Sequence, residues 1–85
     1  MRPTKTEIIE QVKQVTAQVM GLNSLKLKEE FHYIADLGTD SLSMLQIKLE
    51  LEDLYDIDIP DEHITKISSI GSTGDYLLER LSEES

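Results

Sequence analysis

The chain has no cysteine and no tryptophan, and only two prolines and one phenylalanine among its 85 residues. Without cysteine there can be no disulfide bridge, no thiol chemistry and no cysteine-based zinc site, and a reducing compartment becomes the natural expectation. No apolar run approaches the roughly 20 residues that a membrane span needs, and no signal or transit peptide is visible. We therefore expect a cytoplasmic protein without a membrane span.

Basic residues are also scarce. Eight Lys and Arg stand against 17 Asp and Glu, which gives a net charge of −9 that is unevenly placed, with +3 in residues 1–28 and −12 in residues 29–85. A field of that sign repels nucleic acid and anionic lipid headgroups and attracts basic protein surfaces. Nucleic acid is therefore not an expected partner, although surplus carboxylates can also simply keep a small protein soluble.

The length and the hydrophobic periodicity predict one domain, residues 1–85, with an all-α fold. We expect a four-helix bundle with three longer helices and one short helix, and a long ordered loop between helices one and two. The first helix follows the capping-box pair Thr4 and Glu7 and ends at Gly21. Residues 22–39 hold enough apolar side chains to pack as an ordered loop.

The pattern returns at residues 41–55, which predict the second helix, and residues 61–67 predict the short third one. Residues 56–60 alternate like a strand, but Pro60 and the lack of a partner strand favour an extended connector. Ser69 or Ser72 can cap the last helix. The second helix has a broad apolar face. Its members are Leu42, Met44, Leu45, Ile47, Leu49, Leu51 and Leu54.

Several familiar sites are excluded. His32 and His63 are 31 residues apart without cysteine support, so we interpret them as a loop residue and a surface helix residue, not as zinc ligands. A calcium loop beginning at Asp56 would place Pro60 at its fifth position and no glycine at its sixth. There is no glycine-rich phosphate loop. We expect no metal site and no catalytic residue.

The run of residues 36–42 places Asp40 and Ser41 where a loop becomes a helix. A serine there exposes its hydroxyl, and the first-turn N–H groups and the helix dipole favour a negative group, so the site can carry a phosphate. The alternative is a plain helix cap, since Asp and Ser both serve that purpose. A hydrolytic serine is disfavoured because no Gly-x-Ser-x-Gly elbow surrounds Ser41.

Taken together, residues 36–42, residues 50–62, Gly21 and the Asp75-Tyr76 pair resemble the phosphopantetheine-dependent acyl carrier proteins in order and spacing over nearly the whole chain. The resemblance implies that a transferase esterifies Ser41 with 4′-phosphopantetheine from coenzyme A. The thiol at the end of that arm would hold acyl groups as thioesters. The protein would move cargo and catalyse nothing itself.

The resemblance also assigns roles around Ser41. Asp40 would help to hold the magnesium ion during arm transfer, a role compatible with capping the helix. Leu42 would lie beside the arm. Positions that partners contact would include Leu42, Leu49, Glu52, Asp53 and Asp56. For the leucines the alternative is burial in the bundle, and for the acids it is ordinary solvated surface.

The implied partners are a phosphopantetheinyl transferase and acyl-transferring or synthase enzymes with basic docking surfaces, acting on a monomeric carrier. Where related housekeeping carriers have acids, this chain has Ser43 and Gln46, and Lys48 adds a positive charge nearby. This favours a dedicated carrier in fatty-acid, specialised lipid or polyketide-type biosynthesis over the general fatty-acid cycle. An aminoacyl or peptidyl carrier and an unmodified acidic interaction module are the alternatives.

Gly74 stands where the family commonly has a bulky apolar residue that faces the interior. The missing volume either leaves room for cargo between the helices or is filled by neighbours such as Met20 or Tyr76. We favour filling by neighbours.

Overall fold

The computed structural model describes residues 3–83, which form three α-helices and two 3₁₀-helices. In chain order they are α1 (Lys5–Met20), η1 (Ser24–Lys26), α2 (Ser41–Tyr55), η2 (Asp61–Ile67) and α3 (Ile70–Glu83). Within these residues there is no β-strand, and His32 and Ser69 form only an isolated antiparallel bridge. The predicted helical order is confirmed. The short third helix is of the 3₁₀ type, and η1 is an element that the sequence pattern did not indicate.

The ends of two helices follow from local hydrogen bonds. The Thr4 hydroxyl accepts the N–H of Glu7 while the Glu7 carboxylate accepts the N–H of Thr4, each at 3.2 Å, so both halves of the capping box form. Gly21 ends α1 in the left-handed conformation, with φ 69°. At the start of α3 the Ser69 hydroxyl accepts the N–H of Ser72 at 3.1 Å, and the Ser72 hydroxyl accepts that of Ser69 at 2.9 Å. Ser69 is therefore the cap of α3.

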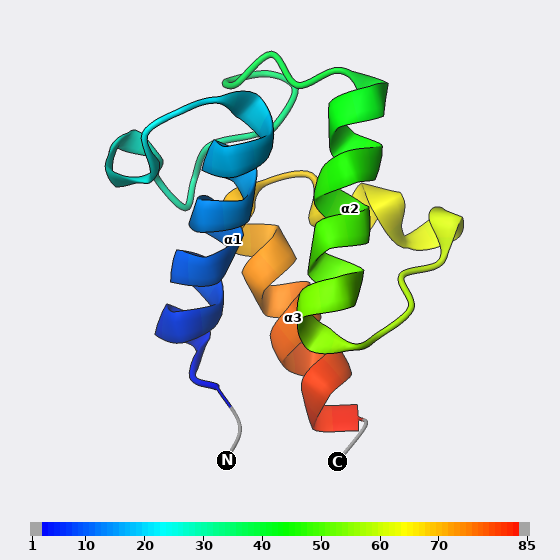
Figure 1. The fold of residues 1–85 in the computed structure, drawn as a ribbon. Coiled ribbons are helices and arrows are strands. Elements are labelled where there is room, and N and C mark those ends of the chain that lie inside the picture. The colour runs from blue at the N-terminus through cyan, green and yellow to red at the C-terminus, as the bar shows by residue number, and fades with distance from the viewer. Residues whose placement is uncertain (1–2, 84–85) are drawn as a thin grey trace.

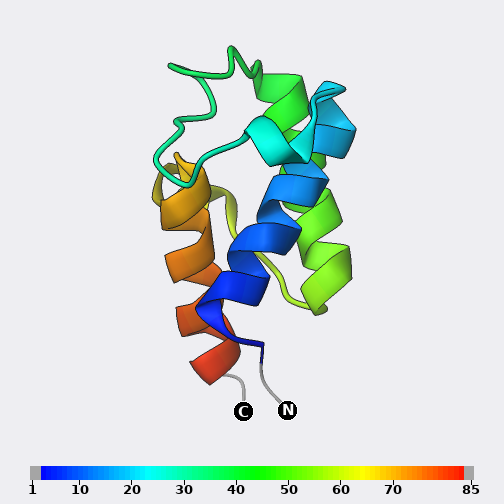
Figure 2. The same cartoon turned by 90° about the vertical axis from the view of Figure 1, so that its left-hand side faces the viewer.

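The three α-helices surround one apolar core. α1 contacts both α2 and α3, and α3 in turn contacts η2 (Figure 1). α1 begins and α3 ends at one end of the bundle, whereas α2 begins at the opposite end, which the loop between α1 and α2 crosses (Figures 1 and 2). Fully buried side chains from every layer meet between the helices. They include Ile8, Val12, Ile47, Leu51, Ile67, Ile70 and Leu77.

The long loop is attached to the core at some of its apolar residues and not at others. Leu27 and Tyr33 are buried, at 5% and 1% exposure, whereas Leu25 and Ile34 are exposed to solvent. The expectation of a packed loop is thus correct, but not all of its apolar side chains take part in the packing. The loop ends at Asp40, and α2 begins at the next residue, so the buried residues of the loop fix where that helix begins.

Removing the Tyr33 hydroxyl should weaken this attachment. That hydroxyl donates to Oγ1 of Thr73 at 2.9 Å, and Thr73 in turn donates to the Ser69 carbonyl at 2.7 Å. Burial raises the pKa of Tyr33, so the phenol keeps its proton. We expect Tyr33→Phe to lower the free energy of unfolding by about 1–2 kcal/mol, because Thr73 loses a buried partner. Urea unfolding measures this, and an unchanged midpoint would contradict the attachment.

Gly74 allows α3 to approach α1 closely. A Cβ atom at this position would overlap Cδ1 of Ile9 and lie 3.0 Å from its Cγ1. The Ile9 side chain, itself 5% exposed, therefore occupies the volume that a larger residue at position 74 would take. The space is filled, as expected, but by Ile9 and not by Met20 or Tyr76.

Candidate functional site at the start of α2

Asp40, not Ser41, caps α2. Its backbone is extended, and its Oδ1 accepts the N–H of Ser43 at 2.8 Å. Ser41 is the first residue of the helix and is exposed, and within residues 3–83 its hydroxyl has no hydrogen-bond partner. The plain-cap alternative therefore applies to Asp40 and leaves the Ser41 hydroxyl available.

The surroundings of Ser41 fit a phosphate ester. The N–H groups of the first helical turn lack partners within the helix, and the dipole is positive at this end. The first turn of α2 itself contains no acidic residue that would repel a phosphate. The loop before it is ordered, since Gly38 takes the left-handed conformation at φ 66° and Thr39 N–H bonds the Tyr33 carbonyl at 2.9 Å. The site can therefore hold a negatively charged group on an accessible oxygen.

The charge of Asp40 should make a pH-dependent contribution to stability. The hydrogen bond from the Ser43 N–H lowers the pKa of this carboxyl below its ordinary value of 3.8. A depressed folded-state pKa stabilises the protein above the unfolded-state pKa, and that contribution is lost as the pH falls through the folded-state pKa. Asp40→Asn keeps a capping oxygen but removes the charge. We expect the variant to be less stable than the wild type near pH 7.

Urea unfolding at several pH values checks this expectation. The difference in stability between wild type and Asp40→Asn should shrink below about pH 4 and vanish once Asp40 is protonated. A difference that stays constant from neutral pH into acid would show that the charge of Asp40 plays no part.

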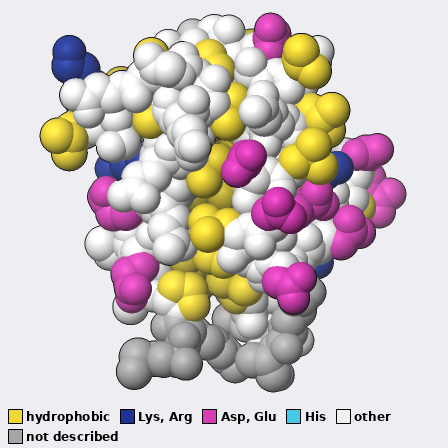
Figure 3. Space-filling view, in the orientation of Figure 1, with side chains coloured by type: hydrophobic (Ala, Val, Ile, Leu, Met, Phe, Trp, Pro, Cys, Tyr) yellow, Lys and Arg dark blue, Asp and Glu magenta, His cyan; other side chains and the backbone are white. Residues whose placement is uncertain are grey.

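The apolar face that was expected on α2 is divided between the core and the surface. Met44, Ile47 and Leu51 are buried, whereas Leu42 is 73% and Leu49 is 52% exposed. Leu45 and Leu54 are also exposed. Apolar side chains therefore lie at the surface along the upper part of α2, with acidic groups below them and towards η2 (Figure 3).

Lys48 does not belong to this surface. Its side chain is only 10% exposed, and its Nζ lies 2.9 Å from Oδ1 of Asp61 at the start of η2. The hydrogen bond with Asp61 raises the pKa of Lys48 and keeps it charged. The expectation that Lys48 adds a positive charge to the surface near Ser41 is wrong, because the charge is directed towards η2 and is paired there.

The three acids near the end of α2 have different surroundings. Asp53 is exposed, and Asp56 is an exposed helix end in the left-handed conformation, with φ 52°. Glu52 is half-buried, and its Oε2 accepts the N–H of Ile59 at 2.7 Å. Glu52 thus holds the connector after α2, a role that spacing alone could not reveal because the acceptor and donor meet only once the chain turns back.

The two histidines lie apart in the fold. His32 is an exposed loop residue, as expected, but His63 is half-buried on η2, with Nδ1 2.8 Å from the Tyr76 hydroxyl. Among residues 3–83 no three His, Cys, Asp or Glu side chains gather as metal ligands would. None of the helices described is both long and apolar enough to cross a membrane.

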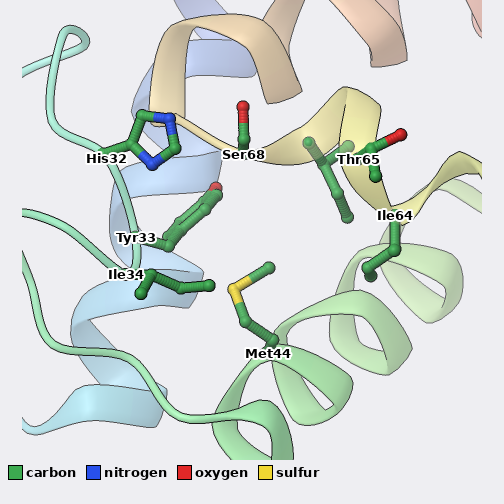
Figure 4. Close-up of a pocket in the computed structure, with 8 residues that line it drawn as sticks. His32, Tyr33, Ile34, Met44, Ile64, Thr65 and Ser68 are labelled. Carbon is green, nitrogen blue, oxygen red and sulfur yellow. The ribbon is translucent and has the colours of Figure 1, made fainter.

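An apolar cavity of about 270 Å³ lies beside α2, one turn after Ser41. Met44 projects into it from α2, between Ile34 of the loop and Ile64 of η2, while the hydroxyls of Thr65 and Ser68 point away from Met44 (Figure 4). The cavity can accommodate an apolar chain, because its interior offers few polar groups. Sequence reasoning did not find it, since its walls come from three segments that are distant in the chain.

Comparisons with known proteins agree with this geometry. Residues 10–77 match the family described as "Phosphopantetheine attachment site". The acyl carrier protein of Clostridium acetobutylicum is 37% identical over 70 residues, 82% of this chain and 91% of the relative. That of Chlorobium phaeobacteroides is 36% identical over 77 residues, 91% of this chain and 99% of the relative.

Solved structures show the same fold. The acyl carrier protein from Enterococcus faecalis has a TM-score of 0.74 at 27% identity, covering 91% of this chain and 98% of that one. A free-standing peptidyl carrier protein from an Acinetobacter baumannii secondary metabolic pathway has a TM-score of 0.80, covering 91% and 95%, but at 19% identity it bears on the fold alone. Family members carry a covalent 4′-phosphopantetheine and are not catalysts. The chain therefore belongs to the acyl carrier protein family.

Proposed function

We propose that Ser41 is the residue that receives the 4′-phosphopantetheine arm. The observation that carries this assignment is that two neighbouring residues at the start of α2 have separate roles. Asp40 makes the capping hydrogen bond, and the neighbouring Ser41 hydroxyl is exposed at the positive end of the helix. When attached, the arm supplies a terminal thiol that holds acyl groups as thioesters. We also propose that Asp40 helps to hold the magnesium ion during transfer.

We further propose that the protein carries acyl intermediates for a dedicated set of cytoplasmic enzymes, in fatty-acid, specialised lipid or polyketide-type biosynthesis. Ser43 and Gln46 leave the first two turns of α2 without an acidic side chain. The apolar cavity beside Met44 supports an acyl cargo over an aminoacyl or peptidyl one, because an apolar chain loses no hydrogen bonds on entering it.

The contact surface that we propose for the partner enzymes has two parts. Along α2 after Ser41 it is apolar, with Leu42 and Leu49 exposed. Beyond them lie the exposed carboxylates of Asp53 and Asp56, which suit a basic docking surface. Glu52 contributes less, because its carboxylate already accepts a backbone hydrogen bond. A partner would therefore place an apolar patch beside Ser41 and basic side chains near the end of α2.

Incubation with a phosphopantetheinyl transferase, coenzyme A and magnesium tests the assignment. Intact mass should increase by one phosphopantetheine per chain, and tandem mass spectrometry should locate it on the peptide that contains Ser41. No mass gain, or a modification on another serine, would refute it. For the cargo, mass spectrometry of the arm released from protein isolated from its own cells should show an acyl group. An aminoacyl group would favour the alternative.

A further inference from the structure

η2 forms one wall of the apolar cavity and is tied to the rest of the molecule by two polar contacts. Ile64 and Ile67 of η2 line the cavity opposite Met44 of α2. At the start of η2, Asp61 is paired with Lys48 of α2 at 2.9 Å, but Asp61 is 97% exposed, so this pair holds η2 only weakly. Further along, the half-buried His63 contacts α3. Ile67 is fully buried in the core, and the second contact is the polar one that joins η2 to α3.

The second contact joins His63, Tyr76 and Arg80. Nδ1 of His63 lies 2.8 Å from the Tyr76 hydroxyl oxygen, and Nη1 of Arg80 donates to the same oxygen at 2.7 Å. The His63 and Tyr76 rings also meet edge to face, with centroids 5.6 Å apart. A guanidinium can only donate, so the phenol oxygen accepts from Arg80. The single proton of the phenol is then available to His63, whose Nδ1 accepts it when the ring is neutral with its proton on Nε2.

We propose that the His63–Tyr76 hydrogen bond is a proton-controlled latch that holds η2 against α3 and so keeps the cavity wall in place. A protonated imidazole carries N–H groups at both nitrogens. The Tyr76 oxygen would then have to accept from His63 as well as from Arg80, and the Tyr76 proton would lose Nδ1 as its acceptor. The imidazolium would also be a second cation close to Arg80. Histidine is the side chain that changes charge between about pH 5 and pH 8. The latch is closed at neutral pH and opens in mild acid.

Charged groups of both signs lie near His63. The groove that contains His63 is also lined by Lys66 of η2 and by Glu79, Arg80 and Glu83 of α3. Any effect of the latch on an acyl chain in the cavity rests on the function proposed above. The latch itself is a property of the unmodified protein.

NMR on the unmodified protein tests the latch. At about pH 8 we expect the Nε2–H tautomer of His63. On lowering the pH to about 5.5, hydrogen exchange of the η2 amides, corrected for intrinsic rates, should show opening that is about fivefold more frequent, the change expected for the loss of one hydrogen bond. His63→Asn keeps an acceptor close to the position of Nδ1 that does not titrate, so its η2 opening should not respond to pH.

Two further variants complete the test. Tyr76→Phe should open η2 more often at both pH values and without pH dependence, while His32→Asn, a change in the only other histidine, should retain the wild-type response. An Nδ1–H tautomer at about pH 8, or an equal pH response in His63→Asn, would overturn the latch. None of these measurements requires a loaded arm, so a failure of arm attachment at Ser41 would refute the proposed function and leave the latch to be judged on its own result.

Discussion

Ser41→Ala is expected to abolish loading by a phosphopantetheinyl transferase, while the free energy of unfolding changes by no more than about 0.5 kcal/mol. Loading is lost because the attachment oxygen is gone. Stability is retained because Ser41 is exposed and Asp40, not Ser41, makes the capping hydrogen bond. Alanine is also a good helix former, so the first turn of α2 should persist. Intact mass after incubation measures loading, and urea unfolding measures stability.

Ser43→Ala is the matched control, since Ser43 lies two residues later on the same helix. It should load like the wild type. Loading of Ser41→Ala at the wild-type level would remove Ser41 as the attachment site. A Ser41→Ala variant that unfolds readily would show that the hydroxyl has a structural role. The claim that Asp40 alone caps the helix would then be wrong.

Ile9→Ala is expected to cost about 3 kcal/mol of stability in the wild type and much less when residue 74 is leucine. In the wild type the change opens a cavity between α1 and α3, because the Ile9 side chain fills the space beside Gly74. Gly74→Leu alone should destabilise by about 2 kcal/mol, because its side chain overlaps Ile9. In the double variant the leucine occupies the volume that Ile9 vacates. Urea unfolding of the four proteins gives the coupling energy, which we expect to be about 2 kcal/mol.

Leu51→Ala provides the comparison, because Leu51 is fully buried on α2 and is not among the nearest neighbours of Gly74. Combined with Gly74→Leu, its cost should be nearly additive. Additive costs for Ile9→Ala and Gly74→Leu would mean that Ile9 does not fill this space. An acyl chain that occupied the region beside Gly74 would then again be an option for the cargo.

Where the sequence was reliable, the signals were local. The capping box at Thr4, the glycine that ends α1 and the serine that caps α3 each act through hydrogen bonds or backbone angles within a few residues. The start of α2 was predicted for the same reason, because Asp40 and the apolar periodicity after it are sufficient to begin a helix there. Ser41 as a candidate site followed from its place at that helix start.

Contacts between distant residues were not predictable in this way. The apolar residues of α2 suggested one broad face, yet Met44 is buried and Leu42 is exposed, since the position of the other helices decides which side meets the core. Lys48 was expected near the Ser41 surface, but η2 brings Asp61 to it. His63 was expected at the surface, but α3 brings Tyr76 to it.

By itself the sequence determined the three longer helices, the capping box of α1 and the serine at the start of α2, because each of these depends on spacing and on side chains a few residues apart. The tertiary structure alone decided that Asp40 does the capping, that Ile9 fills the space beside Gly74, and that an apolar cavity bounded by η2 lies one turn from Ser41. Asp40 and Ser41 are both suited to cap a helix, and only the backbone conformation decides which of them does so. A filled space and a cavity depend on which side chains from separate helices meet, and periodicity along one helix carries no information about that.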